Sequence, residues 1–135
     1  MKKPFVIAID GASSTGKSTL AKGLAKALGF PHVDSGAMYR GVTLYAQQHG
    51  LLENKKLKTE ILLSQLDDIH LRFEGDTFWL NGVDVSAEIR SMQVSEAVSL
   101  VAAIPEVRTF LVAQQRIMGA NQSVVMDGRD IGTVV

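Results

Sequence analysis

The sequence predicts an α/β fold that is built around a parallel sheet. Apolar, β-branched runs at residues 6–9 and 124–126 are typical of buried strands. Helical periodicity appears between them, first at residues 17–28 and again from residue 91 to about residue 118. Strands and helices that alternate along one chain favour a parallel sheet over an antiparallel one.

Length and composition exclude several classes of protein. The chain has 135 residues, of which 46% are hydrophobic and 21% are charged, so it can form one globular domain. Fourteen basic residues balance fourteen acidic ones, and this balance does not indicate a nucleic-acid partner. The absence of cysteine excludes a disulfide scaffold, a thiolate zinc site and a cysteine nucleophile. The apolar run at residues 5–9 is too short to span a membrane. We therefore expect a cytoplasmic protein without a membrane partner.

The expected helix at residues 17–28 follows the first strand after a loop of small residues. It should end at Gly29, because glycine favours the left-handed conformation that terminates helices. Its buried face is expected to contain the apolar residues at helical spacing, which are Leu20, Leu24, Ala27 and Leu28.

The next elements are a short strand at residues 30–34 and a second helix at residues 36–49, which should end at Gly50. Residues 51–66 are expected to be mostly helical.

A β-rich segment follows. Residues 69–73 alternate between apolar and polar side chains, as in a strand with one buried face. Gly75-Asp76 predicts a turn, and Asn81-Gly82 between two short apolar runs predicts a hairpin. We interpret residues 65–92 as an insertion that interrupts a single α/β core.

Helical spacing returns after Ser91. The expected apolar face of the next helix is formed by Val94, Ala97, Val98 and Val101. Pro105 should begin another helix, which we expect Gly119 and Asn121 to end near Met118.

The segment from Gly11 to Ser18 matches the phosphate-loop pattern G-x-x-x-x-G-K-[ST] without a gap. Its glycines let backbone N–H groups converge on a phosphate, and the following helix directs its positive dipole end at the anion. Lys17 would reach the β- and γ-phosphates of ATP, and Ser18 would bind Mg²⁺. The strand before the loop and the helix after it favour a P-loop NTPase-type sheet. The residues expected to bind ATP are Gly11, Ala12, Ser13, Ser14, Thr15, Gly16, Lys17, Ser18 and Thr19.

The segment Asp34-Ser35-Gly36-Ala37-Met38-Tyr39-Arg40 predicts a second phosphate site at the start of the second helix. Asp34 could hold a water molecule on Mg²⁺. Taken alone, Ser35 could simply cap the helix, Tyr39 could be a packing residue and Arg40 a solvated one.

A third group of candidates follows the strand at residues 124–126. Asp127 fits the Walker-B arrangement of an acidic residue after an apolar strand and would help to bind Mg²⁺, and Arg129 adds a guanidinium. Asp130 has no evident partner in the sequence. Three serines earlier in the chain share one stripe of a helix and, on the residues alone, are most simply a solvated face: Ser91, Ser95 and Ser99.

Four segments occur in an order that resembles the bacterial cytidylate kinase family of nucleoside monophosphate kinases. They are the phosphate loop, residues 34–40, residues 83–90 and Asp127-Gly128-Arg129-Asp130-Ile131-Gly132-Thr133-Val134-Val135. The resemblance implies transfer of the γ-phosphate of ATP to CMP or dCMP with Mg²⁺. It also implies a parallel sheet with helices on both faces, an inserted monophosphate-binding domain and a mobile lid.

The resemblance assigns roles to individual residues. Lys17, Arg40 and Arg129 would stabilise the transferring phosphoryl group. The substrate would be bound by Ser35, Tyr39, Arg40, Ser99, Arg108, Arg129 and Asp130, of which Ser99, Arg108 and Asp130 would read cytosine. A carboxylate such as Asp130 accepts from the cytosine N4 amino group, where uracil has an acceptor.

The resemblance also implies that the C-terminal strands and the lid arginines are missing from this chain. We therefore expect residues 1–135 to be an incomplete P-loop kinase core, monomeric and weakly active on its own. Two alternatives stay open: a short P-loop module that binds nucleotide without catalysis, and a kinase for another small metabolite.

Overall fold

The computed structural model describes residues 6–10, 17–30, 32–74, 77–121 and 124–128. It divides into two compact units. The first unit consists of Met1–Gly36 with Val112–Val135, and the second of Ala37–Leu111. The predicted insertion, residues 65–92, lies within the second unit, which is considerably longer. The assignment of residues 65–92 to a substrate-binding insertion stays a prediction.

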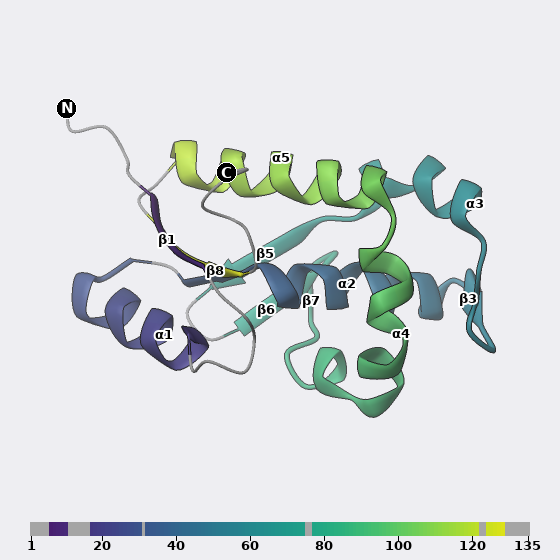
Figure 1. Ribbon diagram of the computed structural model, residues 1–135, viewed down its shortest axis with the longest axis horizontal. Coiled ribbons are helices and arrows are strands. Elements are labelled where there is room, and N and C mark those ends of the chain that lie inside the picture. The colour runs from purple at the N-terminus through teal and green to yellow at the C-terminus, as the bar shows by residue number, and fades with distance from the viewer. Residues whose placement is uncertain (1–5, 11–16, 31, 75–76, 122–123, 129–135) are drawn as a thin grey trace. The chain divides into compact units, whose positions relative to one another are not determined.

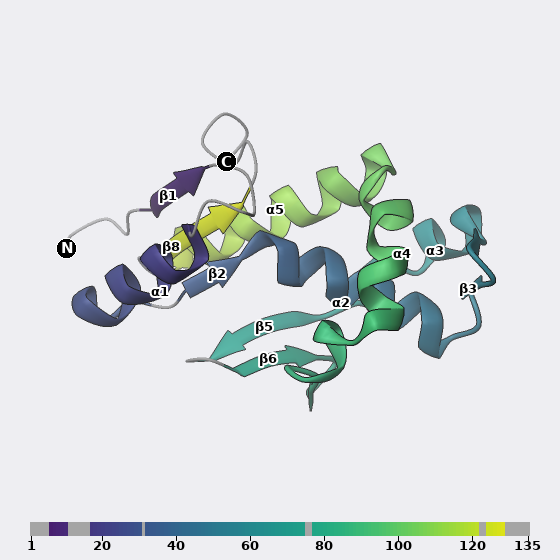
Figure 2. The ribbon, with the colours of Figure 1, turned by 60° about the horizontal axis from the view of Figure 1, so that its bottom comes forward.

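The first unit contains a parallel sheet of three strands, which confirms the predicted α/β class. The strands are β1 (Val6–Asp10), β8 (Val124–Gly128) and β2 (His32–Asp34), in the order β1-β8-β2. The last strand of the described residues, β8, is therefore central; it runs beside β1 in Figure 1 and lies between β1 and β2 in Figure 2. Val125 and Met126, which point to opposite faces, are both almost completely buried. The central strand is thus covered on both sides, as expected for a parallel sheet.

Helix α1 (Lys17–Leu28) has the predicted bounds but not the predicted buried face. The residues packed against Val125 are Ala21 and Ala25, which are buried. Small alanine side chains allow the helix axis to approach the sheet closely. Of the expected apolar face, Leu24 is only partly buried, and three residues are exposed: Leu20, Ala27 and Leu28.

Helix α5 (Pro105–Asn121) begins at the predicted proline and is longer than predicted. The expectation that Gly119 and Asn121 would end it near Met118 is wrong. A glycine in a helix interior costs only about 1 kcal/mol relative to alanine, and tertiary packing can offset this cost. Gly119 is buried, so packing favours continuation of the helix here.

The second unit begins with most of helix α2 (Ser35–Gln48), whose buried residues include Met38 and Val42. Thr43 is also buried, and its hydroxyl donates to the Tyr39 carbonyl at 2.8 Å. Gly50 has φ of +69°, the left-handed conformation expected after a helix.

The mostly helical prediction for residues 51–66 is wrong in its first part. Strands β3 (Leu52–Glu53) and β4 (Lys56–Leu57) form a small antiparallel hairpin there. The two residues of its turn, Asn54 and Lys55, have φ of 51° and 62°. Two successive left-handed residues match the twist of a tight hairpin, and a lysine at the second position gave no glycine signal in the sequence. Helix α3 (Thr59–Ser64) and the 3₁₀ helix η2 (Leu66–Asp68) follow.

The predicted β-rich segment is a three-stranded antiparallel sheet. It contains β5 (Leu71–Glu74), β6 (Thr77–Leu80) and β7 (Val83–Asp84). Asn81 and Gly82 both have positive φ, which confirms the predicted two-residue turn between β6 and β7. The Gly75-Asp76 turn lies outside the described residues.

One face of this sheet packs on α2, which runs beside β5 and β6 (Figure 2). Gly41 lies at the contact. A Cβ atom at this position would come within 2.9 Å of the Phe78 ring and 3.1 Å of Leu71. Since real Cβ atoms almost never approach so closely, the absence of a side chain at Gly41 allows the helix and the sheet to pack at this distance.

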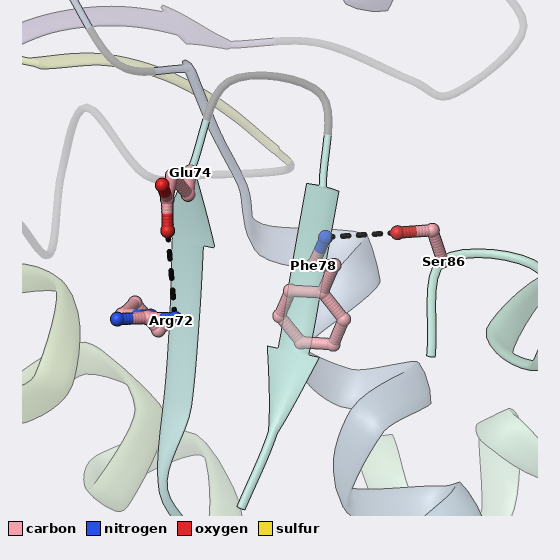
Figure 3. Close-up of polar contacts among 4 residues, drawn as sticks. All are labelled: Arg72, Glu74, Phe78 and Ser86. Carbon is pink, nitrogen blue, oxygen red and sulfur yellow. Dashed lines mark hydrogen bonds and ion pairs between the residues drawn. The ribbon is translucent and has the colours of Figure 1, made fainter. Parts of the chain in front are cut away.

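The other face carries polar and charged groups. Arg72 pairs with Glu74 at 3.4 Å and lies 5.1 Å from the centre of the Trp79 ring. At the far edge, Ser86 replaces a strand partner by accepting from the Phe78 N–H at 2.9 Å (Figure 3). The Ser86 hydroxyl and N–H both donate to Asp84 Oδ1, and these bonds lower the pKa of Asp84 below that of an ordinary aspartate.

The 3₁₀ helix η3 (Glu88–Arg90) leads into helix α4 (Met92–Ala102). Ser91 caps α4 by accepting from the Val94 N–H at 3.3 Å. The predicted apolar face of this helix is confirmed: Val94, Ala97 and Val101 are buried and Val98 is half-buried.

Candidate functional site

The carboxyl ends of the parallel strands form one candidate region in the first unit. Asp34 on β2 and Asp127 on β8 are register partners, and Ile9 on β1 is the partner of Asp127 on the other side. Two residues 93 positions apart thus meet at one edge of the sheet. Parallel α/β sheets bind ligands at this edge, because the loops that follow the strands converge there.

Local structure also places Asp34 near the start of α2. A Cβ atom at Gly36 would lie 3.2 Å from Asp34 Oδ1, so the carboxylate lies against the first turn of the helix. The N-terminus of a helix attracts negative charge. Ser35, the first helical residue, is 7% exposed.

The phosphate-loop prediction is only partly visible in the described residues. Strand β1 ends at Asp10 and α1 begins at Lys17, as the motif requires. Lys17 and Ser18 are the first two residues of the helix, and Thr19 is exposed on its first turn. The remaining predicted ATP-binding residues lie outside the described residues: Gly11, Ala12, Ser13, Ser14, Thr15 and Gly16.

The predicted magnesium site stays a prediction. Asp34 and Asp127 lie on adjacent strands, and carboxylate oxygens are suitable ligands for Mg²⁺. The side chains of Ser18 and Asp127 are not among those described. In the described part of the chain, no group of three or more His, Cys, Asp or Glu residues could hold a metal ion.

The second unit contains a different group of predicted residues, on three helices. Tyr39 and Arg40 are half-buried on α2, whereas Ser99 on α4 and Arg108 on α5 are exposed. Within the described residues, no hydrogen bond or ion pair joins Arg108 to Ser99 or to Arg40. Arg129 and Asp130, the other substrate candidates, lie outside the described residues.

Arg40 makes the most specific contacts in this group. Its Nη1 donates to Ser95 Oγ at 2.7 Å and to the Ile89 carbonyl at 3.1 Å. The arginine of α2 is thus connected to both η3 and α4. From the sequence alone, Ser95 was interpreted as a solvated residue. Its position one turn before Ser99 in the serine stripe was the signal that could have indicated a role in the site.

The sequence of the chain matches a known protein family. A family model described as cytidylate kinase matches residues 7–135, almost the whole chain. The chain belongs to the cytidylate kinase family.

Curated cytidylate kinases are about 50% identical to the chain over the residues that match. A cytidylate kinase of Parabacteroides distasonis is 54% identical over 98% of the chain, and one of Porphyromonas gingivalis is 48% identical over the whole chain. A cytidylate kinase of Pelodictyon phaeoclathratiforme is 49% identical over 99% of the chain. The matches cover 61%, 61% and 58% of these relatives, so the chain spans about three fifths of their length.

No helix in the described part of this cytidylate kinase family member is long and apolar enough to cross a membrane.

Proposed function

We propose that the protein transfers the γ-phosphate of ATP to CMP or dCMP and so forms CDP or dCDP. The observation that carries this proposal is the family match across residues 7–135, at about 50% identity to proteins named cytidylate kinase. This range includes both the phosphate-loop pattern and the segment from Asp34 to Arg40. A nucleotide-binding module without catalysis would account for the first motif but not for the second.

Phosphoryl transfer requires in-line positioning and cations around the equatorial oxygens more than covalent chemistry by the protein. In the proposed reaction, Lys17 contacts the β- and γ-phosphates, and Arg40 and Arg129 hold the CMP phosphate and neutralise developing charge. The helix N-terminus at Lys17 orients the phosphates through its free N–H groups.

Magnesium belongs to the proposal as the ion that bridges the β- and γ-phosphates of ATP and neutralises their charge. Ser18 would ligate it, and Asp34 and Asp127 would hold its water molecules. The register pairing of Asp34 with Asp127 supports this role, because it brings two aspartate residues to one edge of the sheet.

Recognition of cytosine is assigned to Ser99, Arg108 and Asp130. The N4 amino group of cytosine donates where uracil accepts, so a carboxylate discriminates between them. A site built to pair with a polar group can reject a substrate that leaves it unpaired by factors of about 10⁴. Ser35 and Tyr39 would complete the phosphate and sugar contacts. We further propose a monomer that acts in the cytoplasm, where ATP is the phosphate donor.

A substrate panel tests the proposal. Protein expressed from the native reading frame is assayed with ATP and Mg²⁺ against CMP, dCMP, UMP and AMP, with the 135-residue chain as a parallel sample. We expect CDP and dCDP formation far above UDP or ADP formation, and a much lower rate for the 135-residue chain. A better rate with UMP or AMP would overturn the specificity. Nucleotide binding without turnover of any monophosphate would favour the non-catalytic module.

A further inference from the structure

Ser95 occupies a position that the proposed reaction does not use directly. It lies on α4, is exposed, and accepts a 2.7 Å hydrogen bond from Arg40 Nη1. The same nitrogen donates to the Ile89 carbonyl at 3.1 Å, and Ile89 is 4% exposed on η3. Arg40 therefore bonds to two acceptors that lie 49 and 55 residues away in the sequence.

We propose that Ser95 is a positioning residue that fixes the Arg40 guanidinium for the phosphate of the nucleoside monophosphate. The inference rests on the proposed function, since it assigns a task to the arginine of that site.

The geometry of the guanidinium supports this task. Nη1 carries two hydrogens, and the bonds to Ser95 and Ile89 can use both. Neither bond uses the hydrogens of Nε and Nη2, which form the parallel pair that binds phosphate or carboxylate in a bidentate manner. The contact to Ser95 thus orients the fork without occupying it.

The hydrogen bond between Ser95 and Arg40 should raise the affinity for a phosphate by preorganising the arginine side chain. An arginine side chain has many rotamers, and binding a phosphate restricts them at a cost in free energy. A side chain that is already held by hydrogen bonds in the free protein loses less on binding. The Ile89 carbonyl is a backbone group with a fixed position, and Ser95 supplies the second anchor.

The position of Ser95 on its helix adds a second consequence. Ser99 lies four residues further along α4, which corresponds to a rise of about 6 Å. Helix α4 thus connects the phosphate arginine to a residue proposed to read the base. Removal of Ser95 should weaken every pyrimidine monophosphate alike, whereas removal of Ser99 should change the preference between CMP and UMP.

A set of variants in protein from the native reading frame tests the inference by steady-state kinetics. We expect Ser95→Ala to raise the KM for CMP about three- to tenfold and to leave the KM for ATP and the CMP-to-UMP ratio unchanged. Ser95→Thr, which keeps the hydroxyl, should restore most of the affinity. Glu96→Ala, at the adjacent exposed position on α4, is the matched control and should leave the KM for CMP unchanged. An unchanged KM for CMP in Ser95→Ala would overturn the inference.

A double-mutant cycle separates positioning from any independent role of Ser95. In an Arg40→Ala background, Ser95→Ala should add no further loss, because its effect passes through the arginine. Additive losses would overturn the inference.

Nitrogen-15 NMR of the arginine side chains provides a test that needs no turnover. Slow exchange and restricted rotation at Arg40 Nη1 should be present in the wild type and lost in Ser95→Ala. If the wild type fails to phosphorylate CMP but shows this restriction, the proposed function fails and the contact stands. If Arg40 is equally mobile in both proteins, the positioning role fails even where CMP is phosphorylated.

Discussion

In the first unit, distant residues meet through a parallel sheet, whereas in the second they meet through side-chain hydrogen bonds between helices. Asp34 and Asp127 are neighbours because the backbones of β2 and β8 pair. Arg40 and Ser95 are neighbours because one guanidinium reaches from α2 to α4. The first arrangement depends on the backbone register and tolerates many side chains. The second depends on two particular side chains, so single substitutions should affect it more selectively.

The largest effect on activity should come from substitution of Lys17, the lysine of the phosphate loop. This substitution would sharpen the comparison between the two units. We expect Lys17→Ala to lower kcat/KM by about 10²- to 10³-fold, because it removes a cation from the transferring phosphates. Lys22→Ala, an exposed lysine later on the same helix, is the matched control and should leave the rate unchanged. The assay is ATP-dependent phosphorylation of CMP. Equal effects of the two substitutions would contradict a local role for Lys17.

One helical glycine in each unit shows how closely that unit is packed around the helix. At Gly41 in α2, a Cβ atom would meet the Phe78 ring at 2.9 Å, so Gly41→Ala should lower the free energy of unfolding by about 1–3 kcal/mol. At Gly23 in α1, no atom lies within 4 Å of the added Cβ, so Gly23→Ala should raise it by about 0.5–1 kcal/mol.

Urea denaturation measures both changes, and fluorescence of Trp79, the only tryptophan, reports on the second unit. If both substitutions stabilise the protein, the close packing between α2 and the β5–β6 hairpin is not as described.

The smallest effect on stability should come from Asp84, which lies on the edge strand β7 of the second unit. Hydrogen bonds from Ser86 lower the pKa of Asp84 below its ordinary value, so the Asp84 carboxylate stabilises the native state above its unfolded pKa. This contribution is lost as the pH falls through the lowered native pKa. The stability difference between the wild type and Asp84→Asn should therefore be present near neutral pH and vanish in acid.

Side-chain carboxyl NMR titration checks the cause directly. The pKa of Asp84 should lie below that of an ordinary aspartate in the wild type and should rise in Ser86→Ala. A titration that is the same in both proteins would show that Ser86 does not stabilise the carboxylate.

Local signals in the sequence predicted much of the fold. The bounds of α1, the turn at Asn81-Gly82 and the buried face of α4 all followed from spacing and glycine chemistry. The hairpin at residues 52–57 was missed because its turn has lysine, rather than glycine, in a left-handed conformation. The extension of α5 through Gly119 was missed because burial outweighs the low helix propensity of glycine.

Part of the candidate site was also predictable. The phosphate-loop pattern and the segment from Asp34 to Arg40 are each one uninterrupted stretch of residues, so both can be identified from the sequence. Ser95 could not be identified in this way, because its partner is 55 residues away and a serine on a helix surface is usually solvated. The catalytic and binding roles of all these residues stay predictions until the variants are measured.

The sequence by itself determined the α/β class, most helices and strands, and the resemblance to cytidylate kinases, since these depend on local periodicity and contiguous motifs. Only the tertiary structure decided that β8 lies between β1 and β2, that Ala21 and Ala25 rather than Leu20 and Leu28 face the sheet, and that Arg40 bonds to Ser95. Each of these depends on which surfaces meet in space. Periodicity along the chain identifies an apolar face or a polar stripe, but it does not identify the partner that lies against it.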